Sequence, residues 1–205
     1  HATIRRQRQM CIRDSYNGET LADLHIHYRT IGTLRQDEHG SNAVLILHGT
    51  GGSGAGFLRE QFADVLFCSG GVLDAEKYFI TLPDNLGHGQ SSKPSDGLRA
   101  SFPAYDYEDM VQLQHGLITE GLGIDRLRLV MGTSMGGMHS WMWGINYPTM
   151  MDALMPLASL PVEIAGRNRM MRKMVIDSIH NDGAWDNGNY RDCLLYTSPS
   201  PRDIG

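Results

Sequence analysis

The sequence has few cysteines and no long apolar run. Three of its 205 residues are cysteine, which does not suggest the disulfide framework of a small secreted domain. No stretch approaches the roughly 18 apolar residues of a membrane-spanning helix, and no apolar signal segment follows the basic N-terminus. The formal net charge of -5 argues against a nucleic-acid partner. We therefore expect neither nucleic acid nor a membrane among its partners, and a cytoplasmic location is compatible with the few cysteines.

The two ends of the chain resemble one DNA element translated in opposite directions. Residues 10–15 can be encoded by a string whose reverse complement, read in another frame and extended, encodes residues 193–198. Translated sequencing adapters in metagenomic assemblies have this property. We therefore expect residues 1–15 and 193–205 to be adapter-like rather than native, with no part in the function. Residues 16–192 then form the native part of the chain.

Strand patterns and helix patterns alternate along this native part. Residues 24–31 alternate apolar and polar side chains, as a half-buried strand does. Residues 43–47 form a continuous apolar run, which is typical of a strand buried on both faces. Further strands are predicted at 78–82, 127–131 and 153–157, and helices at 57–67, 107–122, 135–147 and 169–180. The alternation predicts an α/β fold: a mostly parallel sheet with helices on both faces.

The strongest chemical signal is the Gly-x-Ser-x-Gly sequence that runs from Gly132 to Gly136. It lies between a predicted strand and a predicted helix, where such a turn presents the serine hydroxyl above the sheet. The glycines let neighbouring backbones pass closely. We predict that Ser134 is a catalytic nucleophile and that the Met135 N–H, at the helix N-terminus, donates to the oxyanion. The alternative is a glycine-rich turn without chemistry.

A second glycine-rich loop directly follows the buried strand at 43–47. In folds with this serine turn, that loop supplies the other oxyanion N–H, and Thr50 is the best candidate donor. The glycine spacing between Gly49 and Gly54 also matches a dinucleotide-binding fingerprint, with Asp74 near the place of a ribose-binding acid. A nucleotide-binding module is therefore an alternative, which we rank lower because it leaves the Gly-x-Ser-x-Gly turn unexplained.

A third loop has the pattern Asp-x-x-Gly-x-Gly-x-Ser, in which Asp84 and Ser91 are expected to cap backbone groups. His88 precedes Ser134 in the chain, whereas the base histidine comes last in this chain order. We therefore predict a structural role for His88. His139 is expected to pack or to hydrogen-bond within its helix. No set of His, Cys, Asp and Glu residues has convincing metal-ligand spacing, so no metal is expected.

Taken in this order, these elements resemble the α/β-hydrolase superfamily, and within it the homoserine O-acetyltransferase-like group. The resemblance rests on residues 24–33, 47–52, 132–138, 141–148 and 181–190. It implies an α/β-hydrolase core over residues 16–192, incomplete because the C-terminal strands and most of the lid are missing. It also implies small-molecule partners, an acyl donor and an acceptor, because Ser134 would pass an acetyl group from acetyl-CoA to the hydroxyl of homoserine. Acetyl-CoA would be a co-substrate, and no bound cofactor is expected.

The resemblance has further implications for the site. Arg172 is the candidate substrate-binding residue, one turn before the position where the alignment expects an arginine. The acid and the base histidine of the catalytic triad would follow the lid, outside this chain, so we expect the chain itself to have little or no activity. A carboxylesterase-type α/β hydrolase is the alternative within the superfamily. A homodimer is one option for the assembly.

Overall fold

The computed structural model describes residues 8–9, 21, 23–38, 40–191 and 194. Most of the expected adapter-like residues, 1–15 and 193–205, lie outside this described part, so the predicted domain boundaries stay a prediction. The chain divides into two compact units. The first comprises residues 1–93 and 103–161, and the second comprises residues 94–102 and 162–205.

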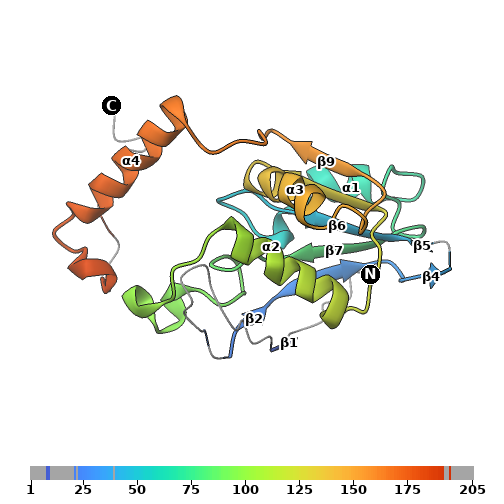
Figure 1. Cartoon of the computed structure of the whole chain (residues 1–205), viewed down its shortest axis with the longest axis horizontal. Helices are drawn as coiled ribbons and strands as arrows, with labels where there is room; N and C mark the ends of the chain where they lie inside the picture. The colour runs from blue at the N-terminus through green and yellow to red at the C-terminus, as the bar shows by residue number, and fades with distance from the viewer. Residues whose placement is uncertain (1–7, 10–20, 22, 39, 192–193, 195–205) are drawn as a thin grey trace. The chain divides into compact units, whose positions relative to one another are not determined.

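The first unit is built on a five-stranded sheet with the strand order β3-β7-β6-β8-β9 (Figure 1). β3 (Tyr28–Ile31) runs antiparallel to β7 (Phe79–Pro83). β6 (Ala43–Leu47), β8 (Leu129–Thr133) and β9 (Leu154–Leu157) continue the sheet from β7 in parallel. The mostly parallel sheet predicted from the sequence is confirmed.

β6 lies at the centre of this sheet, and all five of its side chains are buried. Successive side chains of a strand point to opposite faces. Ala43, Leu45 and Leu47 accordingly belong to one apolar cluster, which we call the Leu45 cluster. Val44 and Ile46 belong to a second one, the Ile46 cluster. A strand that serves two clusters needs an apolar side chain at every position, which explains the continuous apolar run.

Helices cover both faces of the sheet. α2 (Tyr107–Gly116) and α3 (Met135–Asn146) contribute side chains to the Leu45 cluster. On the opposite face, α1 (Glu60–Leu66) packs against the Ile46 cluster. This arrangement confirms the two-sided helical cover that the alternating pattern predicts.

Two small antiparallel pairs accompany the main sheet. β1 (Arg8–Gln9) pairs with β2 (His25–Ile26). β4 (Gln36–Asp37) pairs with β5 (Gly40–Ser41), directly before β6.

The strand predicted over residues 24–31 is interrupted at His27, between β2 and β3. Around this point two serine hydroxyls accept from the strand backbone: the Ser92 hydroxyl accepts from the His25 N–H at 3.0 Å, and the Ser91 hydroxyl accepts from the His27 N–H at 2.9 Å. Ser91 thus caps a backbone group, as predicted. The continuous strand was wrong because alternation of apolar and polar residues does not reveal a distant hydroxyl that takes over a backbone donor.

Two predicted helices also differ from the structure. The helix predicted over residues 57–67 is split into a short 3-10 helix, η1 (Gly54–Leu58), and α1, because Arg59 between them has extended backbone angles. The helix predicted over residues 107–122 ends its α-helical part at the end of α2 and continues as one π-helical turn, η4 (Leu117–Gly121).

The second unit contains the longest helix, α4 (Gly166–His180), which begins three residues before the predicted helix of residues 169–180. It also contains the short 3-10 helices η2 (Pro94–Asp96), η3 (Arg99–Ser101) and η5 (Asp186–Gly188). No residue of α4 is buried. Among the described residues, no helix is both long and apolar enough to cross a membrane.

Candidate active site

Ser134 occupies the turn between β8 and α3, where the sequence predicts it. Its backbone angles are φ 54° and ψ -113°, a combination that residues with a side chain rarely adopt. Its N–H donates to the Leu157 carbonyl at 2.9 Å, which ties the turn to β9. The residue is exposed. The fold therefore holds an exposed serine in a strained backbone conformation, and strain of this kind is concentrated at functional sites.

The glycines around Ser134 are required by close backbone packing. A Cβ atom on Gly132 would lie 2.0 Å from the Gly136 carbonyl oxygen, and one on Gly136 would lie 2.2 Å from the Leu47 carbonyl oxygen. A Cβ atom on Gly137 would lie 2.7 Å from the Leu157 carbonyl oxygen. These contacts are the physical reason for the glycine pattern: the start of α3 is pressed against the ends of three strands.

The glycine-rich loop after β6 lies directly beside the serine. A Cβ atom on Gly49 would be 3.4 Å from the Cβ atom of Ser134. Thr50 follows, is exposed, and its N–H donates to no backbone carbonyl of the described residues. Met135 is the first residue of α3, and the first N–H groups of a helix have no partner within it. The structure thus places the candidate nucleophile next to both segments that contain the predicted oxyanion donors. The catalytic roles of Ser134, Thr50 and Met135 stay a prediction.

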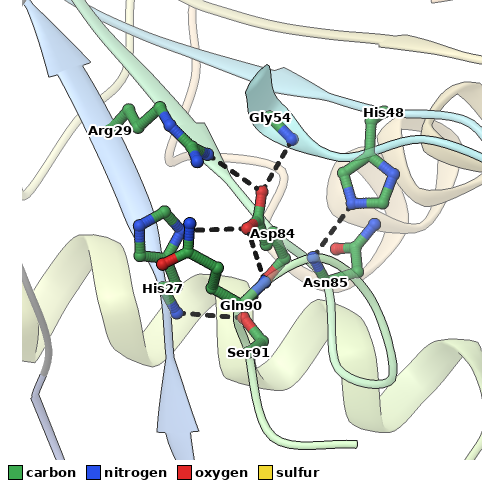
Figure 2. Close-up of polar contacts among 8 residues, drawn as sticks. All are labelled: His27, Arg29, His48, Gly54, Asp84, Asn85, Gln90 and Ser91. Atoms are coloured by element: carbon green, nitrogen blue, oxygen red, sulfur yellow. Dashed lines mark hydrogen bonds and ion pairs between the residues drawn. The ribbon is translucent and has the colours of Figure 1, made fainter. Parts of the chain in front are cut away.

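His48, at the head of this loop, was not singled out by sequence reasoning. Its Nε2 accepts from the Asn85 N–H at 3.0 Å, a contact drawn in Figure 2. Its Nδ1 lies 2.8 Å from the Gly49 carbonyl oxygen. The Gly52 N–H donates to the same oxygen at 3.0 Å. The side chain is buried, and burial lowers the pKa of His48 below its ordinary value.

Asp84 is fully buried at the junction of three segments (Figure 2). Its Oδ1 accepts from the Gly54 N–H at 2.8 Å and from an Arg29 guanidinium N–H at 3.3 Å. Its Oδ2 accepts from the Gln90 N–H at 2.9 Å and lies 2.9 Å from Nδ1 of His27. The predicted capping role of Asp84 is confirmed. The carboxylate also joins β3, the loop after β6 and the loop after β7, which the sequence did not indicate.

These contacts bear on the nucleotide-binding alternative. The Gly54 N–H that would face a phosphate is occupied by the Asp84 carboxylate, and a second anion there would be repelled. Asp74, the candidate ribose ligand, instead caps its own loop by accepting from the N–H groups of Gly70 and Glu76, each at 2.9 Å. The geometry therefore favours an oxyanion loop over a dinucleotide site.

His88 has contacts that fit the predicted structural role. Its Nδ1 lies 2.9 Å from the Leu86 carbonyl oxygen, and its Nε2 lies 2.9 Å from the Thr50 carbonyl oxygen. The second contact links the loop after β7 to the loop after β6. His88 therefore helps to hold the glycine-rich loop after β6, which carries the predicted oxyanion donor Thr50, in place.

His139 is fully buried. It packs as predicted, but its hydrogen bond is not within its own helix: Nδ1 lies 3.0 Å from Nε2 of Gln114 on α2. Burial, followed by the charges of His48 and His88, lowers the pKa of His139 to about 3. Among the described residues no histidine forms a hydrogen bond with Ser134, so no base for this serine is identified in this part of the chain.

Arg172 lies on α4 in the second unit and is exposed. Its Nε donates to Oδ1 of Asn168, one turn earlier in the helix, at 2.9 Å. The substrate-binding role of Arg172 stays a prediction. In the described part of the chain, no group of three or more His, Cys, Asp or Glu side chains is placed to hold a metal ion.

The family described as alpha/beta hydrolase fold matches residues 42–197, which is more than half of the sequence and includes the turn at Ser134. The chain belongs to the α/β-hydrolase family. Within the matched region of this α/β hydrolase, one glycine-rich segment follows β6 and the other lies at the junction of β8 and α3.

Individual proteins show a more specific similarity than the family as a whole. A homoserine O-acetyltransferase of Methanohalophilus mahii is 36% identical over 192 residues, which cover 85% of this chain and 38% of that protein. Among solved structures, the acetyl esterase MekB is 25% identical with a TM-score of 0.78, covering 92% of this chain and 54% of the other. The homoserine O-acetyltransferase of Bacillus anthracis is 26% identical with a TM-score of 0.76, covering 93% and 56%.

These similarities confirm the resemblance to the homoserine O-acetyltransferase-like group of α/β hydrolases. The chain spans only about two fifths to somewhat more than half of the length of these three proteins.

Proposed function

We propose that this protein transfers acyl groups through Ser134, moving an acetyl group from acetyl-CoA to the hydroxyl of a small acceptor of the homoserine type. The observation that supports this proposal best is the exposed Ser134 on a strained turn, with Gly49 of the glycine-rich loop packed beside it. A nucleophilic hydroxyl next to free backbone N–H groups suits acyl transfer, because the developing oxyanion is stabilised where it forms.

The proposed reaction has two steps. The Ser134 oxygen bonds to the acetyl carbon, the carbon–sulfur bond breaks, and the serine proton ends on the thiol of CoA. The acceptor oxygen then bonds to the same carbon, the bond to the serine oxygen breaks, and the acceptor proton returns to Ser134. In each step the N–H groups of Thr50 and Met135 would donate to the oxyanion. Arg172 is retained as a candidate ligand for the acceptor.

An esterase is the second candidate, and the structural match to the acetyl esterase MekB supports it. The two activities share the first half of the chemistry and differ in whether water or an acceptor alcohol attacks the acyl-serine. The relative with the higher identity, 36% against 25%, carries the transferase name. We therefore rank transfer above hydrolysis. A cytoplasmic location and a homodimer remain predictions.

The activity tests use the protein with its triad acid and base present, because little or no activity is expected of this chain by itself. The first test supplies acetyl-CoA with and without homoserine, follows the free thiol, and detects O-acetylhomoserine by mass spectrometry. A transferase releases thiol faster when homoserine is present, whereas an esterase releases it at a rate that homoserine does not change. Peptide mapping after exposure to p-nitrophenyl acetate should place the acetyl group on Ser134, and the Ser134→Ala variant should not be acetylated. Acetylation of another residue at an unchanged rate in that variant would rule the proposal out.

A further inference from the structure

We propose that His48 is a positioning residue for the oxyanion hole: its Nδ1–H, donated to the Gly49 carbonyl, fixes the peptide that carries the Thr50 N–H. This inference rests on the proposed function of Ser134 and Thr50. It assigns a role to a buried side chain that the proposed chemistry does not otherwise use.

The partners of His48 determine which ring nitrogen carries the proton. The backbone nitrogen of Asn85, 3.0 Å from Nε2, can only donate, so Nε2 must be the unprotonated acceptor. The Gly49 carbonyl oxygen, 2.8 Å from Nδ1, can only accept, so Nδ1 must carry the proton. Both backbone groups therefore require the same neutral tautomer. A second proton on the ring would turn Nε2 into a donor that faces another donor.

The peptide bond transmits this constraint to Thr50. The Gly49 carbonyl and the Thr50 N–H belong to one planar trans peptide and point in opposite directions. A donor that fixes the carbonyl therefore also fixes the direction of the N–H. Gly49, Gly51 and Gly52 bring no side chains that could hold the loop, and glycine allows the widest range of backbone angles. Without an anchor, the peptide plane would be free to rotate.

Two further contacts hold the same stretch of backbone. The Gly52 N–H donates to the Gly49 oxygen at 3.0 Å and closes the turn. His88 contacts the carbonyl of the following residue: its Nε2 lies 2.9 Å from the Thr50 carbonyl oxygen. Gly49 itself would place a Cβ atom 3.4 Å from that of Ser134, so the orientation of this peptide decides what the serine faces.

The surroundings of His48 keep its ring neutral. The side chain is 2% exposed, and burial lowers its pKa. The hydrogen bond to Gly49 and the charge of Asp84 act in the opposite direction, and the charge of His88 acts with burial, but burial is the largest effect. With Nδ1 and Nε2 both occupied by backbone partners, the ring is not available as a base for Ser134. Positioning is the role that its geometry supports.

Two variants separate the two hydrogen bonds of the ring. In His48→Asn the side-chain amide nitrogen reaches the place of Nδ1, which keeps the donor to Gly49 and removes the acceptor for Asn85. In His48→Gln the amide oxygen reaches the place of Nε2, which keeps the acceptor and removes the donor. Each variant loses one buried hydrogen bond, so the two serve as matched controls for loss of stability.

The measurement is the rate at which p-nitrophenyl acetate acetylates Ser134, followed by intact-protein mass spectrometry, together with the urea midpoint of each variant. Loss of one oxyanion donor lowers rates by about 10²- to 10³-fold, so we expect His48→Gln to lose at least roughly tenfold and His48→Asn to stay within a few-fold of the parent. Rates that are equal in the two variants, or that follow only their urea midpoints, would overturn the inference.

A spectroscopic test does not depend on catalysis. ¹⁵N NMR of the histidine side chains, with His48 assigned by its absence in His48→Asn, should show Nδ1 protonated and Nε2 unprotonated at neutral pH. The opposite tautomer or a doubly protonated ring would refute the proposed pair of hydrogen bonds, in which Nδ1 donates to the Gly49 carbonyl and Nε2 accepts from Asn85. If Ser134 is not acetylated even in the protein with its triad acid and base present, the proposed function fails while this test still stands. If the parent reacts and His48→Gln matches it, only the present inference fails.

Discussion

Gly132 and Gly136 are packed against each other across the turn that carries Ser134: a Cβ atom on Gly132 would lie 2.0 Å from the Gly136 carbonyl oxygen. No real Cβ contact is this short, and the clash would be with backbone rather than with a flexible side chain. β8 and α3 therefore meet at this point only because the residue at the end of the strand has no side chain.

Replacement of Gly132 by alanine should be strongly destabilising. The added methyl group has no space, so the start of α3 must shift, and overpacking of this kind costs about 2 kcal/mol or more in the free energy of unfolding. Gly56→Ala is the matched control, because a Cβ atom at Gly56 meets nothing within 4 Å, and it should change stability by about 0.5 kcal/mol or less. Urea unfolding of both variants decides the matter; similar losses would contradict the packing argument.

The backbone strain at Ser134 should be measurable as a difference between two substitutions. With φ at 54° and ψ at -113°, the position suits glycine, and strain of this type is worth about 1–3 kcal/mol. We expect Ser134→Gly to be more stable than Ser134→Ala by about 1 kcal/mol. Ser140, within α3, is the control, because there alanine should be the more stable of the two by about 1 kcal/mol. The same order at both positions would mean that the turn is not strained.

The buried carboxylate of Asp84 should be far more important for stability than a surface carboxylate. Asp84→Asn keeps the shape but offers one acceptor oxygen to the N–H donors of Gly54, Gln90, His27 and Arg29. Breaking such a buried network costs about 3 kcal/mol or more. Asp152, which pairs at the surface with Arg126 and Arg128, should tolerate the same change with a loss of about 1 kcal/mol at most. Thermal or urea unfolding would show the contrast.

The sequence was sufficient for the parts of the site that depend on neighbours in the chain. β6 was predicted correctly because a strand buried on both faces needs an uninterrupted apolar run. The turn at Ser134 was predicted because its glycines are required within five residues of the serine. In both cases the physical requirement is local, so it leaves a pattern that can be seen in one stretch of sequence.

The parts that the sequence did not reveal depend on residues that are distant in the chain. The tautomer of His48 is set by Asn85, 37 positions away, and the break at His27 is stabilised by Ser91, 64 positions away. Asp84 gave only a capping pattern, because its four donors come from three separate segments. None of these partners has a fixed spacing, so no pattern in the sequence marks them.

The buried His139 should make stability depend on pH in a defined direction. Its pKa is about 3 in the folded chain, against an ordinary value of 6.5, so between these values the unfolded chain binds a proton that the folded chain does not. Its contribution is therefore fully present above about pH 6.5 and is lost as the pH falls, by up to about 1.4 kcal/mol per pH unit. Burial shifts the pKa of His48 in the same direction.

The variant His139→Asn isolates this contribution. Its side-chain oxygen can take the place of Nδ1 and accept from Gln114, which preserves the hydrogen bond of the parent, but the side chain no longer titrates. Between pH 7 and pH 5 we expect the variant to lose about 2 kcal/mol less of its free energy of unfolding than the parent loses, as measured by urea unfolding at both values. Because the comparison is between two differences, a constant loss from the substitution itself cancels. An unchanged pH dependence would show that His139 is already protonated, or accessible to solvent, in the folded chain.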